Sequence, residues 1–128
     1  GIPDNFYEII NPSDEELVGL YNCVDVFLSP SFKEGFGLTV LQSLACGTPI
    51  VVSRGTSLEE IAGQVGVYVD PTSVEDITKA IFSVINKESS KVADKEALTK
   101  RASLFTWEKT ARETLEVYES INNLTRLR

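Results

Sequence analysis

The chain has 128 residues, of which 42% are hydrophobic and 24% charged. These values are typical of one globular domain that is large enough to bury a core. Its net charge of −7 argues against nucleic acid as a partner, because binding to a phosphate backbone requires a basic surface. Histidine is absent and the two cysteines, Cys23 and Cys46, have no metal-ligand spacing. Zinc sites and histidine-based nucleophilic catalysis are therefore excluded within this sequence.

The sequence also indicates where the protein resides. No apolar stretch approaches the roughly 20 residues that cross a bilayer, and no signal peptide opens the chain. Because residue 1 is Gly1 and methionine is absent, we expect a part of a longer polypeptide. Both cysteines lie in apolar helical contexts typical of small buried side chains, which favours a reducing, cytoplasmic compartment.

Charge is spread unevenly along the chain. Residues 71–128 hold ten basic and nine acidic residues, whereas residues 1–70 hold two basic and ten acidic ones. Solvated helix surface is the simpler interpretation of the basic residues in 71–128. The alternative is a peripheral contact of the parent protein with an acidic membrane surface.

Short apolar runs alternate with helical patterns along most of the chain. Each run has four to six residues and is rich in β-branched or aromatic types, which predicts strands. The four predicted strands are Phe6–Ile10, Val24–Ser29, Ile50–Ser53 and Val65–Val69. Val24–Ser29 and Ile50–Ser53 are almost continuously apolar, as in parallel strands that are covered on both faces.

The predicted helices begin at recognisable caps. Ser13, Ser57 and Ser73 each precede acidic residues, and a hydroxyl N-cap followed by acids stabilises a first helical turn. Around Ser13 and Ser57 the spacing to glutamate also predicts a capping box. Two further helices are expected over Ala93–Ser103 and Trp107–Ile121, the last with Thr106 as its N-cap.

This order of elements predicts the fold class. Alternation of strands and helices followed by two helices is typical of an α/β, Rossmann-like, doubly wound parallel sheet. We expect about four strands, helices on both faces of the sheet and a C-terminal helical tail. Residues 1–128 are interpreted as a single domain.

One segment of the chain contains the candidate binding residues. A loop containing Glu34, Gly35 and Gly37 joins a predicted strand to a helix expected over Leu38–Cys46, which Gly47 ends. The N–H groups of Gly37, Leu38 and Thr39 lack intrahelical partners, so this helix start is suited to an anion. A carboxylate there is unusual for an anion site alone but suits a ligand that also offers sugar hydroxyls. The alternative is a structural turn in which Glu34 is an exposed acid or a cap for a neighbouring backbone group.

The motifs around this loop resemble the glycosyltransferase group-1 family, which has the GT-B fold. The resemblance covers most of residues 9–121 and has a specific central motif. It rests on Leu20-Tyr21, Val24–Ser31, Glu34–Leu38, Ala45–Val51, Glu59–Ile61, Gly66–Pro71 and Phe105–Trp107.

The resemblance implies roles for individual residues. Glu34 would be the catalytic-site acid that hydrogen-bonds to hydroxyls of the donor sugar. Donor binding would further involve the main chain of the loop and helix start, at Gly35, Phe36, Gly37, Leu38 and Thr39. The family's second acid, which holds the ribose hydroxyls, is replaced here by Gln42. This loss of a charge-assisted bond costs roughly 1 kcal/mol. Either the protein tolerates glutamine here, or its donor affinity is reduced, or its activity has been lost.

Two other residues have a functional and a structural interpretation, and a third has a structural one. Arg54 follows a predicted strand, so it either approaches the ligand or is a charge on a surface loop. Glu60 matches an acid of the family and is interpreted as structural rather than catalytic. Trp107 is expected to pack the last helix onto the domain.

For the parent protein, the resemblance implies a retaining, metal-independent transferase that moves a hexose from a nucleotide diphosphate sugar and uses no cofactor. The chain would be the later part of the C-terminal, donor-binding domain of a two-domain enzyme. Because the N-terminal acceptor domain and the basic residues that grip the diphosphate are missing, we expect no activity from this part alone.

Two further expectations remain. Strands missing beside Phe6–Ile10 would leave an exposed sheet edge, which favours self-association. The alternatives to an enzyme are a non-catalytic nucleotide- or phosphate-binding module and an interaction module derived from a transferase domain.

Overall fold

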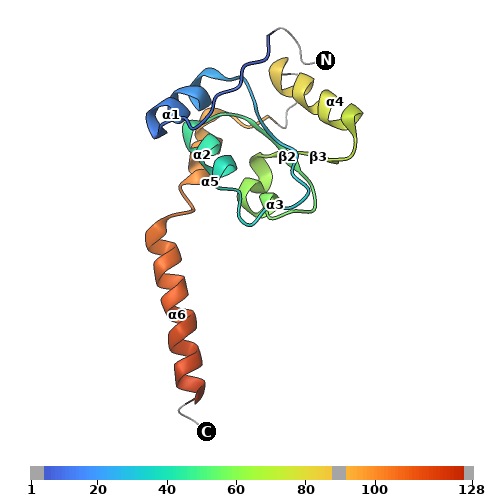
Figure 1. The fold of residues 1–128 in the computed structure, drawn as a ribbon. Helices are drawn as coiled ribbons and strands as arrows, with labels where there is room; N and C mark the ends of the chain where they lie inside the picture. The colour runs from blue at the N-terminus through green and yellow to red at the C-terminus, as the bar shows by residue number, and fades with distance from the viewer. Residues whose placement is uncertain (1–4, 88–91, 126–128) are drawn as a thin grey trace.

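A computed structural model describes residues 5–87 and 92–125 of the chain (Figure 1). Helices and short strands alternate up to a fourth helix, and two more helices follow. The elements are α1 (Asp14–Cys23), β1 (Phe27–Ser29), α2 (Leu38–Cys46), β2 (Ile50–Ser53), α3 (Leu58–Ala62), a 3-10 turn (Gly63–Val65), β3 (Val67–Val69), α4 (Val74–Ile85), α5 (Lys95–Ala102) and α6 (Trp107–Thr125).

The three strands form a parallel sheet in the order β1-β2-β3. Leu28 of β1 pairs with Val51 of β2, and Val52 of β2 pairs with Tyr68 of β3. All four residues of β2 are buried, because this central strand is covered on both faces by helices.

Two apolar cores lie on opposite faces of β2. On one face, Ile50 and Val52 pack with residues of α2, α3 and α5; on the other, Val51 packs with Val69 of β3 and with α4. Alternate residues of a strand point to opposite faces, so one short strand serves both cores. The predicted α/β, Rossmann-like sheet with helices on both faces is confirmed.

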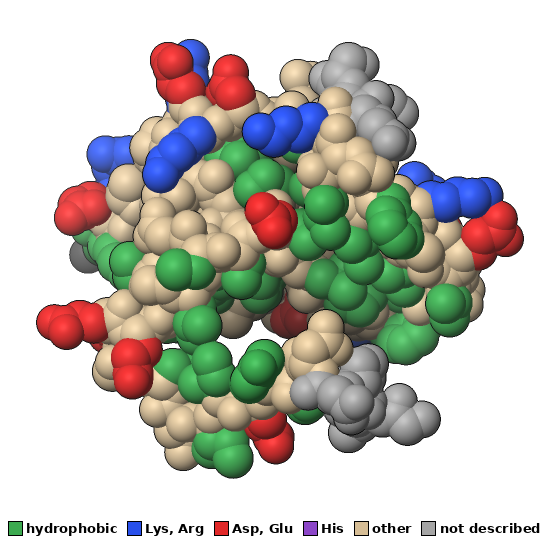
Figure 2. Space-filling view, turned by 90° about the horizontal axis from the view of Figure 1, so that it is seen from above, with side chains coloured by type: hydrophobic (Ala, Val, Ile, Leu, Met, Phe, Trp, Pro, Cys, Tyr) green, Lys and Arg blue, Asp and Glu red, His purple; other side chains and the backbone are tan. Residues whose placement is uncertain are grey.

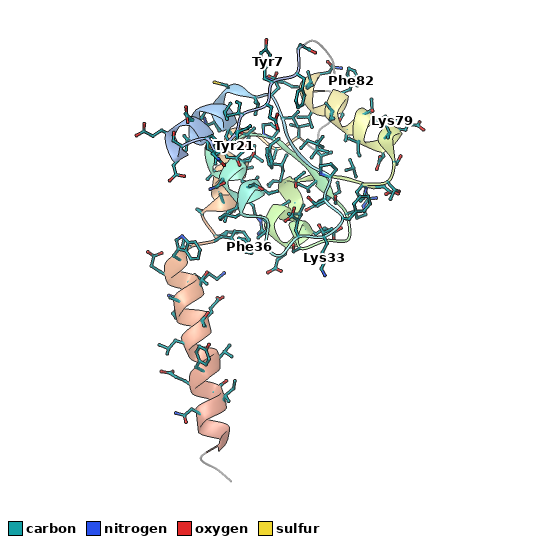
Figure 3. The ribbon with its side chains drawn as sticks, in the orientation of Figure 1. Tyr7, Tyr21, Lys33, Phe36, Lys79 and Phe82 are labelled. Carbon is teal, nitrogen blue, oxygen red and sulfur yellow. The ribbon has the colours of Figure 1, made fainter. Side chains whose placement is uncertain are left out.

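The predicted strand Phe6–Ile10 is wrong, and the sheet therefore has three strands instead of about four. Residues 6–10 have no regular secondary structure, are exposed and belong to no strand of the described sheet. A strand exists only where a neighbouring strand completes its hydrogen bonds. In the described sheet β1 pairs with β2 alone, and residues 6–10 do not pair with its other edge. Tyr7 and Phe82 both lie at the top of the molecule in Figure 3. The same end, seen from above in Figure 2, has hydrophobic side chains around a hollow.

Two of the three predicted serine caps are confirmed. Ser13 forms a capping box with Glu16, whose carboxylate accepts from the N–H of Ser13 at 2.8 Å. The hydroxyl of Ser73 accepts from the N–H of Asp76 at 3.1 Å. The predicted box at Ser57 is wrong, because the hydroxyl makes no cap bond to α3.

Helix α6 leaves the body of the molecule and extends away from it (Figure 1). Trp107 at its first turn is 78% exposed, so the expectation that this side chain packs the helix onto the domain is wrong. The expectation for Cys23 is also wrong, since it is exposed, whereas Cys46 is half-buried. In the part of the chain that the structure describes, no helix has the length and apolarity to cross a membrane.

Candidate functional site

The candidate site begins where β1 ends. Residues 30–37, called the Glu34 loop from here on, connect Ser29 to the first residue of α2. Gly37 ends the loop with a φ of 101°, in the left-handed region that favours glycine. A Cβ atom at Gly37 would lie 2.4 Å from Cδ2 of Leu58, so both backbone conformation and space require glycine here.

The N-terminus of α2 is open. No side chain of the described residues caps it, and its first turn holds no acidic residue. The first intrahelical bond of this turn runs from the N–H of Leu41 to the carbonyl of Gly37 at 3.0 Å, and the N–H groups before it have no intrahelical acceptor. Leu38 and Thr39 are exposed, so this end of the helix dipole faces solvent and suits an anion.

Glu34 is half-buried on the same loop. Its main-chain carbonyl accepts a hydrogen bond from the hydroxyl of Ser57 at 3.0 Å. Within the described residues its carboxylate makes no hydrogen bond or ion pair. The carboxylate oxygens are therefore available as acceptors for hydroxyl groups.

Gly35 differs from Gly37. Its φ lies outside the left-handed region, and a Cβ atom built there would meet no atom within 4 Å. Of these two glycines, Gly37 alone has a positive φ. Neither the fold nor the local space requires glycine at position 35, where the backbone stays open to a close approach from outside.

Phe36 links the loop to another part of the molecule. Its ring meets the ring of Phe105 edge-on, with centroids 6.2 Å apart and planes at 77°. Phe36 lies on the side of the body from which α6 extends (Figure 3). The loop is thus held against the segment between α5 and α6.

Gln42 lies one helical turn after Leu38, on the same face of α2. Both side chains line an open groove of about 340 Å³ between α2 and α5, together with Ala45, Thr99 and Phe105 among others. The structure therefore brings Leu38, Gln42 and Phe105 together. Glu34 does not line this groove.

Among the described residues, the hydrogen bonds of Arg54 and Glu60 run to segments other than the Glu34 loop. The guanidinium of Arg54 donates to the carbonyl of Tyr68 on β3 at 3.3 Å. The carbonyl of Glu60 accepts from Nη2 of Arg101, while its side chain is exposed. The Arg54 contact uses its side chain and the Glu60 contact only its main chain, so the roles of both side chains stay predictions.

The sequence did not reveal Ser57 as a partner of the loop. Its spacing to Glu60 indicated a cap, and no local pattern signals a contact between residues 23 positions apart. Among the described residues, no three His, Cys, Asp or Glu side chains are grouped so that they could hold a metal ion. Metal independence stays a prediction.

Comparison with known proteins agrees with this fold. The family described as Glycosyl transferases group 1 matches residues 1–103, and the chain belongs to this family. It is 37% identical to O-antigen chain mannosyltransferase B of Escherichia coli, over 83% of this chain and 28% of the relative. It is 33% identical to MMP alpha-(1->4)-mannosyltransferase of Mycolicibacterium hassiacum, over 93% of this chain and 30% of the relative.

A solved structure shows the same architecture. Sucrose-phosphate synthase of Thermosynechococcus elongatus superposes with a TM-score of 0.71 at 26% identity, over 86% of this chain and 28% of that one. The chain therefore spans less than a third of the length of each of these three proteins.

Proposed function

We propose that the chain is the donor-binding part of a hexosyltransferase that uses a nucleotide diphosphate sugar. One observation carries this proposal. The uncapped N-terminus of α2 and the unengaged carboxylate of Glu34 lie on one continuous loop at the end of a parallel strand. Ligands of open α/β sheets bind at the carboxyl ends of the strands.

The two features suit the two halves of such a donor. Main-chain N–H groups from Gly35 to Thr39, with the dipole of α2 behind them, would hold the diphosphate and stabilise the charge that develops as it departs. The carboxylate of Glu34 would accept hydrogen bonds from hydroxyls of the hexose. Gln42 would accept from the ribose through its amide carbonyl, without the strength of a charge-assisted bond.

Other parts of the reaction would come from the rest of a longer protein. We propose that an acceptor domain and basic residues that grip the diphosphate lie outside these 128 residues. The chain alone is then inactive and binds the donor weakly, with a Kd on the order of 1 mM. The reaction requires no cofactor or metal. The proposed location is the cytoplasm, where the parent protein makes a peripheral contact with the membrane. Two relatives named as mannosyltransferases support a hexose as the transferred group.

Titration of the 128-residue chain, and of the longer transferase, with UDP-, GDP- and ADP-sugars tests the proposal. Glu34→Ala removes hydrogen bonds to a charged acceptor, so donor affinity falls roughly 10- to 100-fold. The matched control is Glu15→Ala, which removes the same charge from the exposed start of α1 and leaves donor affinity unchanged.

The nucleoside diphosphate without its sugar separates the two halves of the site. Removal of a negative charge beside the diphosphate does not weaken this ligand, so its affinity for Glu34→Ala equals or exceeds that for the wild type. Equal losses for sugar-bearing and sugar-free ligands would contradict the role of Glu34. Absence of binding by the longer transferase would overturn the enzyme proposal.

The second candidate is a non-catalytic nucleotide-binding or interaction module derived from a transferase domain. The substitution at Gln42 favours it, because the charge-assisted bond to the ribose is lost. Gln42→Glu distinguishes the two. In an active donor site this change raises donor affinity about five-fold, corresponding to roughly 1 kcal/mol, whereas a module that binds no donor gains nothing.

A further inference from the structure

Two consecutive residues at the start of α3 contact two parts of the Glu34 loop. The hydroxyl of Ser57 donates to the main-chain carbonyl of Glu34 at 3.0 Å. Leu58 is fully buried, and its Cδ2 atom occupies the space into which a Cβ atom at Gly37 would project. The loop is therefore supported from inside the molecule at both ends of the Glu34–Gly37 segment.

Helix α3 does not need the hydroxyl of Ser57 for its own start. The N–H of Leu58 donates to Oγ1 of Thr56 at 3.2 Å, and the carboxylate of Glu59 accepts from the N–H of Gly55 at 2.8 Å. Ser57 itself has helical dihedrals, with φ −56° and ψ −18°. Thr56 thus performs the capping role predicted for Ser57, and the serine hydroxyl is used across 23 residues instead.

The hydrogen bond from Ser57 to the carbonyl of Glu34 fixes the orientation of a whole peptide group. The carbonyl of Glu34 and the N–H of Gly35 belong to one planar trans peptide group and point in opposite directions. Because the carbonyl points inward to Ser57, the N–H of Gly35 points to the opposite side. A Cβ atom at Gly35 would meet only open space, so nothing in the described residues crowds the backbone there.

We propose that Ser57 is a positioning residue for the donor site. Its hydroxyl orients the peptide group between Glu34 and Gly35, which aims the N–H of Gly35 outward. The same orientation sets the direction in which the Glu34 side chain, with its carboxylate, extends from the main chain. The inference rests on the proposed function of the loop. Ser57 acts through the loop and does not itself touch the donor.

Three variants of the 128-residue chain test the inference. Ser57→Ala removes the hydroxyl and Ser57→Thr retains it. Ser73→Ala is the matched control, because it removes a hydroxyl that caps α4 and has a comparable effect on overall stability. The first readout is the ¹⁵N NMR order parameter of each backbone amide in the loop, which requires no ligand. The second is the affinity for GDP-mannose, UDP-glucose and ADP-glucose.

In Ser57→Ala the order parameters of Gly35 and Phe36 are expected to fall from about 0.85 towards about 0.6, and donor affinity to fall about five-fold. Ser57→Thr restores both, and Ser73→Ala changes neither. Unchanged order parameters of the loop in Ser57→Ala would overturn the inference, as would an equal loss of order in Ser73→Ala. Absence of donor binding in every variant, with the loop loosened in Ser57→Ala alone, would refute the proposed function but retain the positioning role.

Discussion

The ring of Phe36 packs edge-on against the ring of Phe105, with centroids 6.2 Å apart. The guanidinium of Arg101 lies over the Phe105 ring at 5.0 Å, and its Nε donates to the carbonyl of Ile61 at 2.9 Å. These contacts connect the Glu34 loop, through the segment after α5, to the end of α3. Cation–π and edge-to-face contacts each contribute about 0.5–1.5 kcal/mol beyond burial.

Phe105→Ala should therefore destabilise the chain by about 2–4 kcal/mol, because it removes a half-buried ring together with its contacts to Phe36 and Arg101. Urea unfolding followed by circular dichroism measures this change. The control is Phe32→Ala on the Glu34 loop, where the ring is 73% exposed and the expected change is within about 0.5 kcal/mol. Equal effects of the two substitutions would contradict the assigned role of Phe105.

The two glycines of the loop should respond differently to alanine. Gly37→Ala forces a left-handed backbone on alanine and a clash with Leu58, which should cost about 2–4 kcal/mol in unfolding free energy. Gly35→Ala should change stability by less than about 0.5 kcal/mol yet weaken donor binding, because its methyl group occupies open space beside the proposed diphosphate. Loss of stability without loss of binding in Gly35→Ala would contradict this assignment.

Helices α5 and α6 should contribute unequally to stability. Leu98 of α5 is 1% exposed and lies in the core beside α2, whereas Leu115 of α6 is 56% exposed. Leu98→Ala should lower the free energy of unfolding by about 2–5 kcal/mol, whereas Leu115→Ala should change it by less than about 0.5 kcal/mol. Chemical denaturation of both variants decides this; a large loss for Leu115→Ala would show that α6 packs against the body.

Acid should destabilise the fold through two hydrogen-bonded carboxylates. The N–H and hydroxyl of Ser13 lower the pKa of Glu16 below 4.5, and the hydroxyl and N–H of Thr72 lower the pKa of Asp70 below 3.8. A group whose pKa is lower in the folded state stabilises it above the unfolded pKa, and this contribution is lost as the pH falls through the folded pKa.

Thermal unfolding between about pH 7 and about pH 3 measures this dependence. The Tm of the wild type should decrease towards the acid end of the range. Asp70→Asn and Thr72→Val should each reduce that decrease. A Tm that rises on acidification would contradict the assignment.

Much of the fold follows from local patterns in the sequence. The bounds of α2 were predicted correctly because Gly37 and Gly47 both adopt left-handed backbone conformations that end regular structure. The box at Ser13 was also predictable, since both of its bonds lie within four residues. Phe6–Ile10 was not, because a run rich in aromatic and β-branched residues becomes a strand only where it pairs with another strand, and in the described residues it pairs with none.

The candidate site was predictable only in part. A glycine-bearing loop before a helix indicates an anion site from sequence, and the structure places Glu34 and the start of α2 on that loop. The support from Ser57 and Phe105 could not be foreseen, because both contacts depend on tertiary packing. At Ser57 the pattern misled, because Thr56, one residue earlier, satisfies the helix start in its place.

The most direct test of the donor-site proposal is a ¹⁵N NMR titration of the 128-residue chain with nucleotide diphosphate sugars. We predict saturable shifts of the amide signals of Gly35, Phe36, Gly37, Leu38 and Thr39, with a Kd on the order of 1 mM. Glu34→Ala should weaken these shifts for the sugar-bearing ligand but not for the nucleoside diphosphate. Saturable shifts confined to other parts of the chain, or none in the Glu34 loop and α2 at saturating donor, would contradict the account.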